Sequence, residues 1–171
     1  EADRLAHLGS PVLHNRSLQP LFNTNVSLAV RSSYASHTDF TLIAPKSSSA
    51  SAPVVTNLAS VALFNFRLTT GSSRVLELLA DAGLIPLAHW KLAHHRVEFA
   101  FTHENRKQVQ MILENSDGSV GLSDISVRED FGLVALVSAD ASLYRRGFAR
   151  LLSRDARPLF NDDLSLVTLV P

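Results

Sequence analysis

Strands are indicated wherever apolar and polar side chains alternate with a period of two. The first such pattern is the short segment 26–30, and the second covers 64–68, where large apolar side chains alternate with polar ones. A third alternation, over 96–101, predicts that residues 87–101 form a hairpin that turns near His94 and His95. The sheet that these strands form is expected to bury one of its faces.

The alternation in the hairpin also predicts which side chains reach the core. Phe99 and Phe101 are assigned to the buried face. Arg96 and Glu98 are assigned to the exposed face, where substitution by alanine is expected to be tolerated. A strand register that differed by one residue would exchange these two pairs.

Two helices are predicted between these strands. An apolar face over 75–80 predicts the first helix, which follows the hydroxyl-rich loop 69–73 and ends at Gly83. Apolar residues at helical spacing over 109–113 predict the second, and a further strand begins at Val120. The order strand, helix, strand, strand, helix, strand is that of a ferredoxin-like unit.

An internal repeat indicates a second copy of this unit. Residues 61–64 (VALF) match 134–137 (VALV), and residues 85–87 (IPL) fall opposite 157–159 (RPL). The two matches occur in the same order and at nearly the same offset along the chain. Two copies of one supersecondary unit are therefore predicted.

The second copy is predicted to be shorter than the first. It has a strand over 131–137, a helix over 142–154 and strands near 157–160 and 164–170, and it lacks a second helix. Residues 54–58 are expected to supply the missing strand of its sheet. The predicted fold class is therefore α+β, with two ferredoxin-like βαββαβ units of which the second is abbreviated.

An N-terminal part and a linker precede the two units. Apolar residues at helical spacing and a strand make up residues 1–45. Residues 46–53 (KSSSASAP) have no apolar pattern and are predicted to be a linker. The first unit is then assigned to residues 54–127 and the second to residues 128–171.

Composition restricts the partners that we expect. The 171 residues include 16 basic and 16 acidic side chains, so no net field attracts nucleic acid or an anionic membrane. Cysteine is absent, which excludes disulfides and fits a reducing compartment. No apolar run approaches the roughly 20 residues that span a bilayer. We therefore expect a cytoplasmic protein with no nucleic-acid and no membrane partner.

Recognisable catalytic motifs are missing from the sequence. It contains no G-x-x-x-x-G-K-[ST], G-x-G-x-x-G, G-x-S-x-G or H-E-x-x-H. His89, His94, His95 and His103 invite a zinc hypothesis, but no cysteine and few nearby carboxylates could complete the shell. We predict no catalytic residue, no metal site and no cofactor in this chain, and an independent small enzyme is disfavoured.

The most specific motif is the segment Gly9–Pro20 (GSPVLHNRSLQP), which resembles the "vLHpRtlep" segment that closes the kinase domain of aspartate kinases. Residues 26–34 (VSLAVRSSY) resemble the family's "VRnt" strand, and residues 41–43 (TLI) resemble the end of its "GTxI". The resemblance implies that residues 1–45 end a kinase domain and that paired ACT domains follow. The nearest pattern is that of bifunctional aspartate kinase–homoserine dehydrogenases, type II.

His14 and Arg16 carry the first part of this resemblance. The resemblance implies that they form a structural lock between the kinase domain and the regulatory region. The alternative is an ordinary amphipathic helix terminus. Asn15 stands where the family usually has proline.

The resemblance also implies an effector site, because ACT domains of this family place effector amino acids at the loop between strand and helix. Unpaired N–H groups at a helix start favour a carboxylate. In the second unit, the loop 138–142 has no glycine and carries Asp140. The candidate effector-binding residues are therefore those of the first loop, Thr70, Gly71, Ser72 and Ser73. Helix capping by Ser72 or Ser73 is the alternative.

The function that the resemblance implies is a regulatory and oligomerisation module of an aspartate kinase, in the biosynthesis of threonine, methionine and lysine. The chain alone is expected to be inactive. The parent protein is expected to be a kinase that uses ATP and Mg, joined to a dehydrogenase that uses NAD(P). Expected partners are a second copy of the chain in a homodimer or higher oligomer, threonine or lysine as effector, and the kinase and dehydrogenase domains. The alternative is a purely structural dimerisation domain that binds no effector.

Overall fold

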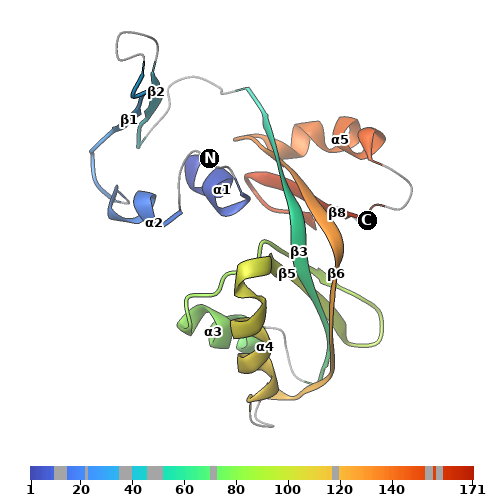
Figure 1. The fold of residues 1–171 in the computed structure, drawn as a ribbon. Coiled ribbons are helices and arrows are strands. Elements are labelled where there is room, and N and C mark those ends of the chain that lie inside the picture. The colour runs from blue at the N-terminus through green and yellow to red at the C-terminus, as the bar shows by residue number, and fades with distance from the viewer. Residues whose placement is uncertain are drawn as a thin grey trace.

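The computed structural model describes residues 1–9, 15–21, 23–34, 40–45, 52–69, 73–116, 120–152, 156 and 160–171. Their main feature is a six-stranded antiparallel sheet in the order β4-β5-β3-β6-β8-β7 (Figure 1). Helices pack against this sheet. The combination of helices with an antiparallel sheet confirms the predicted α+β class.

Two long strands form the middle of the sheet, β3 (Val54–Leu68) and β6 (Leu122–Val137). They pair along nearly their whole length and run through both halves of the molecule in Figure 1. Shifts of register interrupt the pairing, and such irregularities bend a strand pair. A Cβ atom on Gly132 would lie 3.1 Å from the carbonyl oxygen of Leu58, so glycine allows the two backbones to approach closely here.

The first unit is built on the C-terminal half of β3. It continues through α3 (Ser73–Asp81), β4 (Ala88–Lys91), β5 (Arg96–Thr102), the 3-10 helix η2 (His103–Asn105) and α4 (Arg106–Glu114) to the N-terminal half of β6. The strand order β4-β5-β3-β6 places the first strand between the third and the fourth. This element order is the predicted βαββαβ unit.

The core of the first unit confirms the predicted buried face of the hairpin. Four phenylalanine rings are fully buried between the sheet and the two helices, and they pack edge to face. Their ring centroids are 5.9 Å apart for Phe64 and Phe101 and 5.2 Å apart for Phe66 and Phe99. The helices contribute the buried side chains of Val75, Leu79, Val109 and Leu113.

The second unit is built on the C-terminal half of β6. It continues through the 3-10 helix η4 (Ala141–Tyr144), α5 (Arg145–Leu151), β7 (Phe160–Asn161) and β8 (Ser165–Val170). Val54–Leu58 pairs with Leu133–Val137, so the N-terminal half of β3 is the fourth strand. The order β3-β6-β8-β7 therefore repeats that of the first unit.

The sequence-based elements of the second unit differ from the structure in detail. The helix predicted over 142–154 is a 3-10 turn followed by α5, and of the strand predicted near 157–160 only Phe160 is described. The strand predicted over 131–137 is the continuation of β6, which begins at Leu122. The division that we propose between residues 127 and 128 thus falls inside a strand that both units share.

The expectation that Glu98 lies on an exposed face is wrong. Its side chain is buried, with 3% exposure. The Nδ2 group of Asn65 donates a hydrogen bond to Glu98 Oε1 at 3.1 Å, and Arg96 Nη1 donates to Asn65 Oδ1 at 2.8 Å. Glu98 is covered because the sheet is buried on both faces at this point, where Trp90 lies opposite it on β4.

A central core lies between the two units, on the sheet face that α3, α4 and α5 leave open. It joins apolar residues of β3 and β6 with residues of β4, β5 and β8, among them Leu63, Ala100, Leu133, Val167 and Leu169. The two outer strands of the sheet, β4 and β7, meet at its rim, where the Phe160 ring lies 4.9 Å from that of His89 and 6.3 Å from that of Trp90. We call this junction of β4 with β7 the seam.

The N-terminal part consists of short elements beside the two units. These are α1 (Ala2–His7), α2 (Asn15–Leu18), the 3-10 helix η1 (Gln19–Leu21), and a separate hairpin of β1 (Leu28–Val30) with β2 (Thr41–Ile43). The strand predicted over 26–30 is thus formed at its C-terminal end. Leu8, which follows α1, is fully buried in the central core.

Candidate effector loops and the α1 contact

The first candidate effector loop lies mostly outside the described residues. Thr70, Gly71 and Ser72 are not described, and Ser73 is the exposed first residue of α3. The first turn of α3 carries no acidic residue that could repel an anion. The assignment of an effector to this loop therefore stays a prediction.

The second loop is described, and its backbone already has partners. The N–H of Ser138 donates to the carbonyl of Leu164 at 3.0 Å, and the N–H of Asp140 approaches Ser138 Oγ at 3.3 Å. The N–H of Ala139 donates to the carboxylate Oε1 of Glu1 at 2.6 Å. A carboxylate of the chain itself thus takes a backbone donor of the loop that a ligand carboxylate would use.

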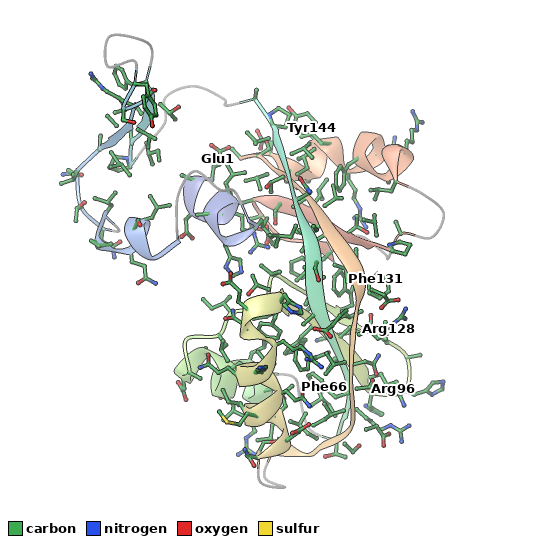
Figure 2. The ribbon with its side chains drawn as sticks, viewed as in Figure 1. Glu1, Phe66, Arg96, Arg128, Phe131 and Tyr144 are labelled. Carbon is green, nitrogen blue, oxygen red and sulfur yellow. The ribbon has the colours of Figure 1, made fainter. Side chains whose placement is uncertain are left out.

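Figure 2 shows Glu1 beside the second unit, far along the molecule from Phe66 and Arg96 in the first. Sequence reasoning missed this contact, because 138 residues separate Glu1 from Ala139 and no local pattern connects them.

The predicted junction residues do not supply a described contact. His14 lies outside the described residues, and although Arg16 belongs to α2, its side chain is not described. The contact between the N-terminal part and the two units comes instead from α1, through Arg4 and His7. Neither was singled out by the sequence analysis.

Arg4 binds both edges of the sheet at the seam. Its Nε donates to Ser165 Oγ at 2.9 Å, and its Nη2 lies 2.6 Å from Asp162 Oδ2, both in the second unit. The same Nη2 donates to the carbonyl of Leu87 in the first unit at 3.2 Å. Burial lowers the pKa of Arg4 while Asp162 and Asp3 act to raise it, and an arginine keeps its charge through such changes.

His7 adds a second contact with the first unit. Its Nε2 lies 3.3 Å from the carbonyl oxygen of Pro86, so the proton of the neutral ring is on Nε2 when this hydrogen bond forms. Burial is the largest influence on the ring and lowers the pKa of His7. The hydrogen bond to Pro86 acts in the opposite direction.

The histidines considered for zinc lie in different settings. His89 is wedged between the rings of Phe99 and Phe160, where burial first and Lys91 second lower its pKa. His94 and His95 occupy a tight turn with φ of 59° and 60°, as the predicted hairpin requires. His103 Nδ1 lies 3.1 Å from Glu129 Oε1. Among the described residues no three ligand-type side chains form a group that could hold a metal ion.

An open hollow of about 190 Å³ lies beside the start of α1. It is lined by α1, by η1 and by the β1–β2 hairpin, with Glu1 and Asp3 as its acidic residues. Helix α1 therefore has the rest of the N-terminal part on one side and the two units on the other. None of the helices in the described ranges has the length and apolar character needed to cross a membrane.

Two ferredoxin-like units that share their long strands define the class of this fold, which is that of aspartate kinase regulatory regions. The chain superposes on E. coli aspartokinase III in complex with aspartate and ADP (R-state) with a TM-score of 0.75, at 19% identity, over 99% of this chain and 41% of that one. For aspartokinase III with lysine and aspartate (T-state) the TM-score is 0.63, at 18% identity, over 98% of this chain and 42% of that one. For the ligand-free regulatory subunit of aspartate kinase from Thermus thermophilus the TM-score is 0.55, at 14% identity, over 68% of this chain and 85% of that one.

In sequence, the chain is 31% identical over 150 residues to the bifunctional aspartokinase/homoserine dehydrogenase 2 of Escherichia coli (strain K12). The match covers 81% of this chain and 18% of that protein, so the chain spans less than a fifth of the curated relative. No protein-family model matches the chain. The resemblance to the regulatory region of aspartate kinases, and to a bifunctional enzyme in particular, is confirmed.

Proposed function

We propose that the chain is the regulatory and oligomerisation module of an aspartate kinase, within a bifunctional aspartate kinase–homoserine dehydrogenase. The observation that carries this proposal is the pair of ferredoxin-like units, which superposes on the R-state of aspartokinase III over 99% of the chain. The sequence identity with a bifunctional relative supports the second half of the proposal. The module itself is expected to hold no catalytic residue.

The chemistry of the parent protein follows from the same proposal. Its kinase domain would transfer the terminal phosphoryl group of ATP, with Mg²⁺, to the side-chain carboxylate of aspartate. Its dehydrogenase domain would reduce aspartate semialdehyde to homoserine with NAD(P)H. Both activities would require residues outside this chain.

We propose further that an amino-acid effector, threonine or lysine, binds at the loop of residues 70–73. The start of a helix offers unpaired N–H donors and a partial positive charge to a carboxylate. A related enzyme carries lysine in its T-state, which supports an amino acid as the class of effector. The second loop is the weaker candidate, because Glu1 already accepts a hydrogen bond from Ala139.

A melting screen with threonine, lysine, methionine and S-adenosylmethionine tests the effector. A ligand that binds only the folded state raises its stability by about 2.7 kcal/mol at a hundredfold excess over Kd. Gly71→Val is expected to remove this shift by blocking close approach of the ligand to the backbone. Gly147→Val is the matched control, because Gly147 lies on the exposed surface of α5 with no atom within 4 Å of the added Cβ.

The alternative is a structural dimerisation domain that binds no effector. In this alternative the hydrogen bond from the Ala139 N–H to Glu1 would hold the second loop in place without a ligand. Absence of a shift with all four compounds at millimolar concentration would remove the effector proposal and leave this one. Sedimentation is expected to show a homodimer at tens of micromolar, and a strict monomer would contradict both versions.

A further inference from the structure

Helix α1 touches both units and the core between them, along a single short segment. At its start Glu1 binds Ala139 of the second unit. One turn later Arg4 binds Asp162 and Ser165 of the second unit together with Leu87 of the first. His7 then reaches Pro86 of the first unit. These contacts lie on both sides of the seam, because Leu87 directly precedes β4 and Asp162 directly follows β7.

Arg4, Ser165 and Asp162 form a ring of polar contacts in which each side chain contacts the other two. Ser165 Oγ accepts a hydrogen bond from Arg4 Nε and donates one to Asp162 Oδ1 at 2.9 Å, while the other carboxylate oxygen of Asp162 meets Arg4 Nη2. A guanidinium offers five donors in a fixed plane, which lets one side chain join acceptors on two strands at once. Ser165 is fully buried, so an Arg4 that left this position would leave buried polar atoms without their partner.

The end of α1 is held as firmly as its beginning. Leu8 is fully buried in the central core, and Gly9 follows in a left-handed conformation with φ of 92°. A Cβ on Gly9 would clash with the side chain of Leu58, on the N-terminal half of β3. Backbone at this position therefore packs directly on the strand that the two units share.

The seam itself has weak contacts of its own. Within the described residues β4 and β7 exchange no ladder hydrogen bonds, and they meet through the rings of His89, Trp90 and Phe160. The strands on either side of the seam are each paired with only one neighbour. This junction is therefore held by side-chain contacts rather than by strand pairing.

We propose that α1 is a clasp that holds the two units at one relative position, with Arg4 as the residue that joins them across the seam. Release of α1 then allows the units to rotate about the bent strands β3 and β6. Because α1 also contacts the rest of the N-terminal part, this movement would be coupled to those elements. The use of this coupling to regulate a kinase rests on the proposed function, whereas the clasp does not.

Spin-label distances between the two units test the clasp in the chain as it exists. The chain has no cysteine, so labels at Glu77→Cys on α3 and Ala149→Cys on α5, diluted with an excess of unlabelled chain, report one distance within a single protomer. Both positions are exposed. We expect a single narrow distribution in the doubly labelled chain and a shifted or broadened one after Arg4→Ala. Lys107→Ala, which removes an exposed cation on α4, is the control and is expected to leave the distribution unchanged.

Amide hydrogen exchange on the same variants shows whether a change in the label distance is accompanied by release of α1. Arg4→Ala is expected to raise the exchange of residues 2–8 by about tenfold or more, because charged hydrogen bonds are lost. If hydrogen exchange of residues 2–8 rises about tenfold but the label distance stays the same, the proposal is overturned. It is also overturned if neither the exchange nor the distance changes. If Arg4→Ala does not fold, Arg4→Lys is read instead, since it keeps a charge beside Asp162 and loses the planar set of donors.

The regulatory use of the clasp has a separate readout in the parent enzyme. Arg4→Lys is expected to change the effector concentration for half-inhibition by about fivefold or more, without changing the uninhibited turnover. The label experiment uses neither effector nor kinase, so it can succeed where effector binding fails. Unchanged inhibition together with a changed label distance would overturn the regulatory use and leave the clasp.

Discussion

The two units have the same strand order but very different means of support. The first unit has two helices on one face of its sheet and a core of four buried phenylalanine rings. In the described residues of the second unit one helix, α5, covers the corresponding face, and the cluster under it is formed by Leu136, Ala141, Phe148 and Leu166. The first unit therefore buries most of its core within itself, and the second depends on its neighbours.

The neighbours of the second unit are the N-terminal half of β3 and helix α1. Val54–Leu58 supplies its fourth strand, and Leu8 and Arg4 cover and bind its other side. Both come from earlier in the chain than the unit itself. One topology can thus be completed locally in one copy and by distant segments in the other.

The largest difference between the units is expected in their cores. Phe99→Ala should lower the free energy of unfolding by about 3–5 kcal/mol, because Phe99 is fully buried among other rings. Phe148→Ala should cost about 3 kcal/mol or less, since Phe148 belongs to the smaller cluster and is 5% exposed. Urea unfolding followed by circular dichroism measures both. A larger effect of Phe148→Ala would reverse the comparison.

Glu98 provides a second, smaller test, on the side of the first unit that faces away from its helices. Glu98→Ala should cost about 1–3 kcal/mol, because it leaves the partly buried Asn65 amide without its acceptor. Arg96→Ala should cost less, since the Arg96 side chain is 39% exposed. The same urea titration measures the free energy of unfolding of both variants. If both lose equally little stability, the face of the sheet that carries Glu98 is not buried.

The pattern of hydrophobic residues predicted the parts of the fold that depend on neighbours in sequence. The alternation of Phe64, Phe66 and Leu68 gave a strand with one buried face because the helices that cover it follow directly. The adjacent His94 and His95 marked the turn of the hairpin. The alternation puts Glu98 on the sheet face opposite to Phe99, which is correct. Its environment was predicted wrongly because this second face of the sheet is also buried.

Other features depend on contacts that no local pattern encodes. The charged run Arg128-Glu129-Asp130 hides the continuity of β6, since three polar residues in succession interrupt the alternation of a strand. Arg4 lies 161 residues from Ser165 and 83 from Leu87, so its role could be found only in three dimensions. Of the predicted effector loop only Ser73 is described, and that part of the candidate site stays a prediction.

Acidification should act on the contacts near the seam, and its effect is expected to be the smallest. The pKa values of His7 and His89 are lowered in the folded state, chiefly by burial, so both rings favour the neutral form there. Unfolded histidine titrates near pH 6.5, so stability is fully present above that pH and is lost as the pH falls through the folded-state pKa. The charged groups that act on His7 are Arg4, Asp3 and Asp162, and Lys91 acts on His89.

Urea unfolding at pH 7.5 and at pH 5 measures this dependence. The chain should be less stable at pH 5, and His7→Gln should reduce the difference, because an amide can still donate to the carbonyl of Pro86 without titrating. An unchanged difference in His7→Gln would remove His7 from the explanation.

Hydrogen exchange in a chain that lacks residues 1–9 tests most directly whether the second unit depends on α1 while the first does not. Amides of α5, β7 and β8 should lose protection, because the deletion removes Glu1, Arg4 and Leu8 from their contacts with the second unit and the central core. Amides of α3, α4 and β5 should keep theirs, since their phenylalanine core is untouched. Equal loss in both units, or full protection of the second, would contradict the division between a self-supported unit and a dependent one.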